Sequence, residues 1–291
     1  MQSYLDIIET VLTNGKRKAN RTGVDTLSCF ALNYRVDLSK GYPLLTTKSV
    51  NFKAMLQETL WYLSGQEHIR ELRRHTKIWD HWADDNGNLE TAYGRYWRRF
   101  PIPSSGVELS GEVFLDKTHP NVQQEQDGSY SFDQIGYLLS ELRRNPFSRR
   151  LVVTAWHPAN AAASKLPPCH YTWALNVQPD NEGNPHTLNC HLTQRSADIG
   201  LGVPFNLACY SFLTLAIAQE MGLQAGEFVH TMIDAHIYFD HVEGLKTQLE
   251  RIPKELPTLS IAKKPLLELT FDDVQLIDYN PHPFIRLPVA V

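Results

Sequence analysis

The sequence predicts an α+β fold in which a few long helices pack against one large β-sheet. Segments with the alternating apolar pattern of strands are concentrated after residue 150, and they are mixed with longer segments that carry apolar residues at helical spacing. The composition, 42% hydrophobic and 21% charged, is that of an ordinary globular protein and argues against long disordered regions. We expect residues 1–291 to form a single domain.

The first third of the chain contains two predicted helices and one predicted strand. Residues 1–12 carry apolar side chains on one helical face, and Asn14-Gly15 is a C-cap signal. Residues 26–36 alternate and are rich in β-forming residues, which predicts a strand. Residues 52–63 carry leucines at helical spacing, and this helix is expected to end at Ser64-Gly65.

The chain changes character between residues 101 and 130. Pro, Gly, Ser, Asp and Gln accumulate there and the apolar periodicity is lost, which predicts a surface insertion. A helix is expected to follow, because Ser131 and Gln134 have the spacing of a capping box and an apolar stripe comes after them. Asn145-Pro146 is expected to end this helix.

The second half of the chain supplies most of the predicted sheet. Strands are expected at residues 150–156, 171–178, 187–194, 227–238 and 274–279, and helices at residues 207–221 and 241–251. Residues 199–219 carry no charge, but Pro204 and Asn206 interrupt them near the start. The remaining apolar segment is long enough only for a buried core helix, not for a membrane span.

Charge and cysteine content narrow the functional classes. The chain has 28 Lys and Arg against 32 Asp and Glu, a net charge of −4, which disfavours a dedicated nucleic-acid or anionic-membrane binder. The four cysteines are scattered and form no CxxC pair, so we expect free thiols in a reducing compartment and no metal site. No secretory or transit segment opens the chain, and we expect a cytoplasmic protein.

Cys169 is the candidate nucleophile. It follows Pro167-Pro168 at the start of a predicted strand, where the prolines fix its approach. The alternative is a structural thiol, since free cysteine is among the most buried residue types. His170 suggests a Cys–His hydrolase, but successive side chains of a strand point to opposite faces, and no third orienting group is evident in the sequence.

Two further groups of polar residues are candidates for ligand binding. Residues 194–198, with Asn206 shortly after them, combine a guanidinium, a hydroxyl, a carboxylate and an amide, which suits a phosphorylated polar ligand. A turn capped by Asn206 as the N-cap of the next helix is the simpler interpretation, and both can hold. Asp234, His236 and Tyr238 form a polar column on one strand face, which requires partners.

Taken in chain order, these and other short segments resemble thymidylate synthase along nearly the whole chain. They include Arg21, in a loop that could fold over a ligand, and Arg149 and Arg150, a pair that is ordinarily solvated. The matching segments are Arg21-Thr22-Gly23, Thr46-Thr47-Lys48, Glu58 with Leu60-Trp61, Ile78-Trp79-Asp80 with Trp82, Tyr93-Gly94, Ser148-Arg149-Arg150, Pro168-Cys169-His170, Gln194-Arg195-Ser196, Asp198, residues 202–206, residues 234–238 and residues 288–291.

The resemblance implies a thymidylate synthase-like catalytic domain with a large mixed β-sheet, and an activity. A member of this family converts dUMP to dTMP with 5,10-methylenetetrahydrofolate, which leaves as dihydrofolate. Cys169 would add to carbon 6 of the uracil, and an adjacent Arg195 would lower the pKa of the thiol. The residues with implied catalytic roles are Cys169, Glu58, Tyr93, Arg195 and Asp198. Glu58 would organise proton transfer through water, and Tyr93 would lie near the carbon 5 proton.

The resemblance also implies how the nucleotide is held. Arginines would surround the phosphate, with Arg149 and Arg150 supplied by the other subunit of a homodimer. Asn206 would read the uracil edge, because an amide offers both a donor and an acceptor. The implied nucleotide-binding residues are Arg21, Arg149, Arg150, Arg195, Ser196, Ala197, Asp198, Asn206, His236, Ile237 and Tyr238.

The implied folate-binding residues are Lys48, Asn51, Ile78, Trp79, Trp82, Asp198 and Ala290. For Trp79 and Trp82 the alternative is an ordinary role in the core. A nucleotide hydroxymethylase, which ends the same chemistry with water instead of hydride, is the alternative function. Trp79 and Leu166, which would shield the reacting carbon, favour the hydride outcome, and Asn206 argues against a cytosine substrate. A non-catalytic RNA-binding role would need a basic surface, which the composition does not suggest.

Overall fold

The computed structural model describes residues 1–89, 92–102, 118–159, 161 and 164–290. The chain divides into two compact units, which are described separately. The larger unit consists of Met1–Leu56 with Cys169–Val291, and the smaller one is Gln57–Pro168. The single catalytic domain expected for residues 1–291 stays a prediction.

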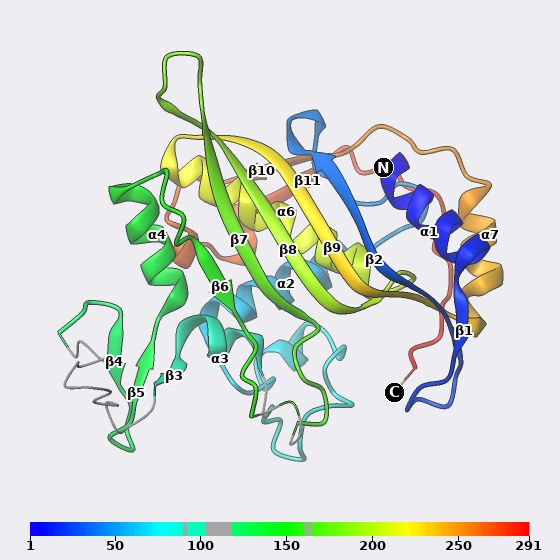
Figure 1. Ribbon diagram of the computed structural model, residues 1–291, viewed down its shortest axis with the longest axis horizontal. Helices are drawn as coiled ribbons and strands as arrows, with labels where there is room; N and C mark the ends of the chain where they lie inside the picture. Colours follow the sequence, from blue (N-terminus) through cyan, green and yellow to red (C-terminus); the bar gives the residue numbers. More distant parts are fainter. Residues whose placement is uncertain (90–91, 103–117, 160, 162–163, 291) are drawn as a thin grey trace. The chain divides into compact units, whose positions relative to one another are not determined.

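The larger unit contains the predicted mixed sheet (Figure 1). Its strands lie in the order β1 (Lys16–Lys18), β2 (Thr26–Asp37), β9 (Gln224–Tyr238), β8 (Pro185–Asp198) and β7 (His170–Pro179). The β8–β9 pair is parallel and the other pairs are antiparallel. The sheet is mixed because a long helix connects β8 to β9, whereas the turn between β7 and β8 makes a hairpin.

Helix α6 (Gly202–Met221) is the core helix of the larger unit. It packs against β8 and β9, while α1 (Gln2–Asn14) packs against β2, β9 and α7 (Val242–Leu249). By length and composition α6 could cross a membrane, but 72% of its most apolar window is buried inside the protein. It is therefore the core helix that the sequence predicts.

Helix α6 corrects one prediction about its start. The helix begins at Gly202 instead of residue 207, and Leu201 occupies the N-cap position that was expected for Asn206. Pro204 does not end the helix, because it lies in the first turn, where the missing N–H would have no partner within the helix. Asn206 consequently lies inside α6, and its side chain is not committed to capping.

Shorter elements complete the larger unit. Strands β10 (Thr258–Ile261) and β11 (Val274–Ile277) form an antiparallel pair. Helix α2 (Phe52–Ser64) begins in this unit, after Asn51. The chain also has 3-10 segments at Leu38–Lys40, Leu72–Arg74, Phe239–His241, Leu266–Glu268 and Phe271–Asp273. Predicted helices and strands over residues 1–12, 26–36 and 52–63 are confirmed with ends shifted by one or two residues.

The described part of the smaller unit contains the second half of α2, helices α3 and α4, and short strands. Helix α3 (Tyr93–Arg98), which the sequence did not indicate, packs against α4 (Gln134–Arg144). Its strands are β3 (Phe100–Ile102), β5 (Tyr130–Phe132) and β4 (Val122–Gln124), which form one sheet in that order, and β6 (Val152–Thr154). The predicted surface insertion at residues 101–130 lies partly outside the described residues, which omit 103–117.

The start of α4 also differs from the prediction. Ser131 belongs to β5, and the N-cap is Asp133, whose carboxylate accepts a hydrogen bond from the Gly136 amide at 2.9 Å. The same carboxylate forms a bidentate ion pair with Arg98, at 2.9 and 3.0 Å. Asp133 therefore both caps α4 and ties it to α3, which the Ser131–Gln134 spacing could not reveal.

Candidate functional site

The candidate nucleophile lies immediately before β7. Its backbone carbonyl accepts a hydrogen bond from the Arg195 amide at 2.9 Å, and Arg195 Nη2 is 3.7 Å from Cys169 Sγ. The pairing of β7 with β8 produces this contact, because His170 lies opposite Gln194 in the ladder. Neighbouring strands therefore hold a thiol and a guanidinium together.

The neighbouring histidine has a different partner. His170 is buried, and its Nδ1 lies 2.8 Å from the hydroxyl of Tyr210 on α6. Burial, with a smaller contribution from His230, lowers the pKa of His170 to about 3, so the imidazole is neutral at pH 7. This arrangement agrees with the opposite orientation expected for adjacent side chains on a strand.

The electrostatics of the thiol have two opposing parts. Burial raises the pKa of the Cys169 thiol, and the charges of Arg195 and Arg21 lower it, with Asp198 acting in the same direction as burial. The net result is a pKa above the ordinary value. Arg195 does act to lower the pKa of the thiol, as expected. The pKa is nevertheless raised, because the effect of burial is larger than that of the neighbouring charges.

Asp198 ends β8 in a well-defined polar setting. Its Oδ1 accepts hydrogen bonds from the amides of Gly200 at 2.8 Å and Leu201 at 3.3 Å. Burial acts to raise the pKa of Asp198, but the hydrogen bond and charge of His241 outweigh it, and the pKa is lowered. Buried Lys48 donates to the Gly200 carbonyl at 2.5 Å, and burial lowers the pKa of Lys48 to about 8.

The predicted polar column is present on β9, and neighbouring strands supply partners for it. Asp234 accepts from Lys18 Nζ at 2.5 Å and from Ser28 Oγ at 2.6 Å, and its own Oδ1 is 3.7 Å from His236 Nδ1. Tyr238 is half-buried at the end of the same strand. Lys18 and Ser28 were not among the predicted site residues. The alternating pattern of β2 predicts which face of the strand Ser28 lies on. It does not predict that β2 pairs with β9, and this pairing is what places Ser28 beside Asp234.

The parallel pairing of β8 with β9 brings two predicted groups together. Ser196 lies beside Asp234, and Asp198 lies beside His236. Ala197 and Ile237 come between them in the sequence and are fully buried, so neither side chain is available to a ligand. The polar groups of the two strands therefore form one surface, although each strand was predicted separately.

Asn206 carries an unused acceptor. It lies in α6, and its Oδ1 is buried without a hydrogen-bond partner among the described residues. Buried amide oxygens are normally satisfied, so such an atom indicates a place for a ligand donor. The structure therefore indicates ligand binding by Asn206 more strongly than its residue type and position did, because Leu201 and not Asn206 is the N-cap of α6.

Glu58 is the principal titratable group of the smaller unit. It is buried in α2, and its Oε1 accepts a hydrogen bond from Trp79 Nε1 at 2.6 Å. Burial raises the pKa of Glu58 to about 7, although hydrogen bonds from Tyr62 and Trp79 act to lower it. A carboxyl group with this pKa exchanges its proton near neutral pH, as an acid–base group requires.

Aromatic rings surround the Glu58–Trp79 pair. The Trp79 ring centroid lies 5.9 Å from that of Trp61, 5.7 Å from Trp82 and 6.0 Å from Tyr93. Tyr93 is buried, whereas Trp79 and Trp82 are half-buried, as is Ile78 beside them. Trp79 and Trp82 are therefore not enclosed core aromatics, and both retain surface that a ligand could contact.

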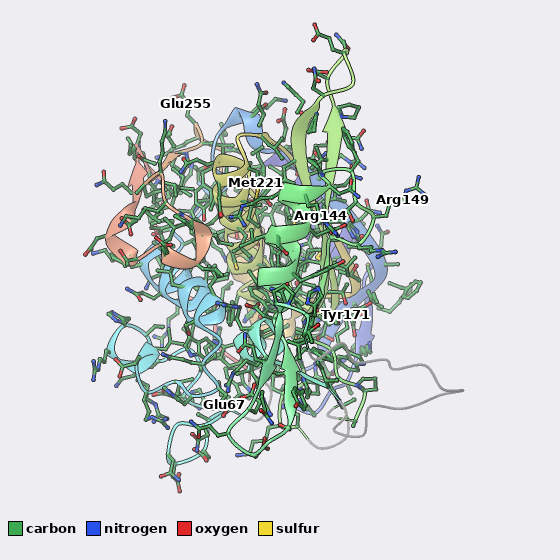
Figure 2. The ribbon with its side chains drawn as sticks, turned by 90° about the vertical axis from the view of Figure 1, so that its left-hand side faces the viewer. Glu67, Arg144, Arg149, Tyr171, Met221 and Glu255 are labelled. Carbon is green, nitrogen blue, oxygen red and sulfur yellow. The ribbon has the colours of Figure 1, made fainter. Side chains whose placement is uncertain are left out.

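The predicted phosphate-binding arginines other than Arg195 are exposed. Arg21 lies in the loop between β1 and β2, and Arg149 and Arg150 precede β6. Figure 2 shows the Arg149 side chain pointing away from the ribbon. Within its own unit the structure brings Arg21 close enough to Cys169 to influence the thiol, as noted above.

Two residues predicted to bind folate, Asn51 and Ala290, lie in the two separate chain segments of the larger unit. Asn51 is exposed and caps α2, since its Oδ1 accepts from the Ala54 amide at 3.1 Å. Ala290 is half-exposed near the end of the chain. The cap gives Asn51 a structural role that the sequence analysis did not assign.

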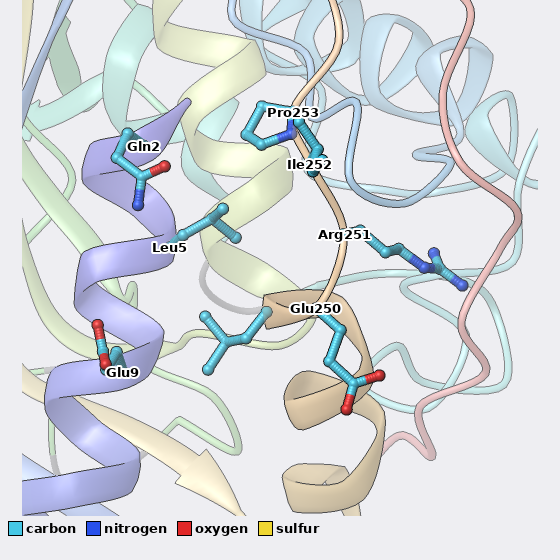
Figure 3. Close-up of a pocket in the computed structure, with 8 residues that line it drawn as sticks. Gln2, Leu5, Glu9, Glu250, Arg251, Ile252 and Pro253 are labelled. Atoms are coloured by element: carbon cyan, nitrogen blue, oxygen red, sulfur yellow. The ribbon is translucent and has the colours of Figure 1, made fainter.

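Cavities in the larger unit lie apart from the thiol. One of about 370 Å³ lies between α1 and the residues after α7 and is lined by Leu5, Glu9 and Arg251 (Figure 3). A larger one, about 880 Å³, includes Ser49 and Asn51. Within the described ranges, His, Cys, Asp and Glu side chains form no group of three or more suited to a metal ion.

Comparison with known proteins identifies the family. Residues 2–291 match the family model described as thymidylate synthase. The chain is 45% identical, over 338 aligned positions, to a protein of Haloferax volcanii named thymidylate synthase, and the alignment covers 98% of this chain and 95% of that protein. This coverage spans both units, including the Cys169 thiol just before β7 and the Glu58 carboxyl group on α2. The chain therefore belongs to the thymidylate synthase family.

Proposed function

We propose that the chain catalyses the reductive methylation of dUMP to dTMP with Cys169 as its nucleophile. Family membership supports the reaction and favours it over hydroxymethylation, which was the alternative. The contact of 3.7 Å between Cys169 Sγ and Arg195 Nη2 carries the assignment of the nucleophile. A thiolate adds to carbon 6 of uracil, and this makes carbon 5 nucleophilic.

Arg195 serves both the thiol and the phosphate. Its guanidinium offers several donors, so one face can stabilise the Cys169 thiolate while others bind phosphate oxygens. Arg21 and Ser196 contribute further donors to the phosphate. The raised pKa of the Cys169 thiol in the ligand-free protein is consistent with these two roles of Arg195. It keeps the thiol protonated and unreactive until the nucleotide binds.

Asn206 selects the base. Its unused, buried Oδ1 accepts the imide N–H of uracil, and its amide donates to the neighbouring carbonyl. Cytosine presents the reverse pattern and would leave buried polar groups unpaired, at a cost of about 1–3 kcal/mol for each group. His236 and Tyr238 bind the sugar hydroxyl, from the polar surface that β8 and β9 share.

The residues of the larger unit fit the folate. An ionised carboxylate at Asp198, held by two backbone amides, can accept from the N–H groups of a pterin, and Lys48, a buried cation, suits its anionic end. When bound, 5,10-methylenetetrahydrofolate supplies the one-carbon unit and the hydride. Ile78, Trp79 and Trp82, which belong to the smaller unit, contribute the apolar surface that excludes water from the reacting carbon.

Glu58 and Tyr93 handle protons in the same reaction. Glu58 has a pKa of about 7, so it can take up and release a proton at neutral pH without a strong driving force. Trp79 fixes the orientation of this carboxyl group through its hydrogen bond. Tyr93 acts near the carbon 5 proton of the base.

The nucleotide product tests the function directly. Purified protein incubated with dUMP and 5,10-methylenetetrahydrofolate should give a nucleotide of the mass of dTMP, together with dihydrofolate detected by its absorbance. The same incubation with dCMP should give no product. A product with the mass of the hydroxymethyl nucleotide, or turnover of dCMP only, would contradict the proposal.

The protein acts as a cytoplasmic homodimer in which Arg149 and Arg150 bind the phosphate in the partner's site. Large exposed apolar side chains on the sheet support the dimer: Phe30 of β2 is 83% exposed and Ile233 of β9 is 37% exposed. Exposed large apolar side chains are typical of an interface, and a second copy offers the same surface by symmetry.

Subunit complementation tests the shared sites. Cys169→Ala and Arg150→Ala chains, each inactive alone, should recover activity after verified subunit exchange, since one site of each hybrid dimer is free of both changes. Random exchange should give about a quarter of wild-type activity. A mixture of Cys169→Ala with Arg195→Ala is the matched control and should stay inactive, because both residues belong to one subunit. Equal recovery in both mixtures, or in neither, would refute the shared site.

A further inference from the structure

His241 is a fully buried histidine to which no role has yet been given. It ends the 3-10 segment Phe239–His241 and directly precedes α7, and its side chain has no solvent exposure. The sequence offers no local signal for it, because its partners lie 43 and 47 positions away. Those partners are Asp198, at the end of β8, and Pro288, near the end of the chain.

The two ring nitrogens of His241 face two different segments. Nε2 lies 2.7 Å from the carbonyl oxygen of Pro288, to which it can only donate. Nδ1 lies 3.6 Å from Asp198 Oδ1. Asp240 is the other carboxylate near the ring, at 3.8 Å from Nε2, and the Tyr238 ring lies 5.5 Å away between centroids. The imidazole thus spans the distance between a carboxylate and a backbone carbonyl.

Two glycines make room for this arrangement. A Cβ at Gly200 would lie 2.5 Å from His241 Nδ1, and a Cβ at Gly244 would lie 2.7 Å from Leu287 Cδ2. Ile285 and Leu287 are buried, whereas Arg286 and Pro288 between and after them are exposed. The segment before the chain end is therefore fixed by two apolar side chains and, beyond them, by the hydrogen bond from His241.

We propose that His241 is a positioning residue that links Asp198 to the C-terminal segment 285–290, so that the carboxylate and the segment are held in place together. Asp198 and Ala290 are both on the folate side of the proposed function, and the inference rests on that function for its effect on folate. An unlinked Asp198 could rotate away from the pterin, and an unlinked segment could leave the protein surface from Arg286 onward, Leu287 included.

The charges are consistent with this link. Burial acts to lower the pKa of His241, but Asp198 and the Pro288 carbonyl outweigh it and raise that pKa, while His241 lowers the pKa of Asp198. Both shifts favour an imidazolium whose Nε2 donates to the Pro288 carbonyl and whose Nδ1 faces the ionised Asp198 carboxylate in an ion pair at 3.6 Å. Lys48 and His236 are the other basic side chains that interact electrostatically with Asp198.

Two amide variants separate the two contacts. The amide nitrogen of His241→Gln lies near the position of Nε2 and retains the donor to Pro288, whereas that of His241→Asn lies near Nδ1 and retains only a polar N–H group facing Asp198. His282→Gln is the matched control, because His282 also contacts a backbone carbonyl, that of Ile252 at 2.9 Å, but lies away from Asp198.

Two readouts test the link. The first is the rate at which trypsin cleaves ligand-free protein after Arg286, followed by intact mass. His241→Asn should be cleaved about tenfold faster than wild type, because cleavage follows the population of the released segment, and His241→Gln should be close to wild type. The second is KM for 5,10-methylenetetrahydrofolate, which should rise about tenfold in both variants, with KM for dUMP within about twofold of wild type.

The outcomes are distinguishable. An unchanged cleavage rate in His241→Asn would overturn the link. Equal changes in KM for the folate and KM for dUMP would also overturn it, because they would show that His241 has a merely structural role. A lower thermal midpoint together with faster cleavage at all tryptic sites would do the same. Absence of dTMP formation in wild type would refute the proposed function, whereas the cleavage readout would still support or overturn the link between His241 and the segment.

Discussion

Replacing Cys169 with alanine should lower kcat by roughly four orders of magnitude or more, because no other group in the proposed mechanism can form the bond to carbon 6 of uracil. Binding of dUMP should remain measurable by calorimetry, since the phosphate and base contacts do not depend on the sulfur. The steady-state rate of dTMP formation and the dissociation constant of dUMP are the two measurements.

The other cysteines provide the controls for this prediction. Cys29 is half-buried and distant in sequence, and Cys29→Ala should keep nearly full activity. Cys190 is buried, and burial raises its pKa to about 12, so it is a poor nucleophile at pH 7. Substantial turnover by Cys169→Ala, with loss of turnover on replacing Cys190 or Cys209, would show that the nucleophile is assigned wrongly.

Replacing Glu58 with glutamine is expected to lower kcat by about 10²–10⁴ with little change in KM for dUMP. The glutamine carbonyl can still accept the hydrogen bond from Trp79 Nε1, so the local structure is retained, but the side chain can no longer exchange a proton. In wild type the pH profile of kcat should bend near pH 7, the pKa of Glu58, and this bend should be absent from the variant. Glu71→Gln, a change at an exposed carboxylate, is the control and should leave both rate and profile unchanged.

The same variant has a predicted signature in stability. Because burial raises the folded-state pKa of Glu58 from 4.5 to about 7, the fold favours the neutral form. That contribution is fully present below the unfolded-state pKa and is lost as the pH rises through about 7. The melting temperature of Glu58→Gln relative to wild type should therefore rise between about pH 5 and about pH 8. A constant difference across this range would mean that Glu58 is already ionised in the folded protein at low pH.

The elements that the sequence predicted best are those with a strong local pattern. Apolar spacing located α1, α2 and the long strands to within one or two residues at most ends. The errors concern helix starts: Ser131 was expected to begin α4, and α6 was expected to begin after Asn206. In both cases the residue that caps or starts the helix depends on packing between elements and on the tolerance of a first turn for proline.

The sequence by itself determined the family, the fold class and the identity of the candidate residues, because these follow from residue types in a fixed order. The tertiary structure alone decided what each group can do chemically. Burial raises the pKa values of Cys169 and Glu58 and leaves the Asn206 oxygen without a partner in the part of the chain that the structure describes, while strand pairing gives Asp234 its contact with Ser28. Desolvation and hydrogen bonding depend on segments that are far apart in the chain, and no local pattern records which of them will meet.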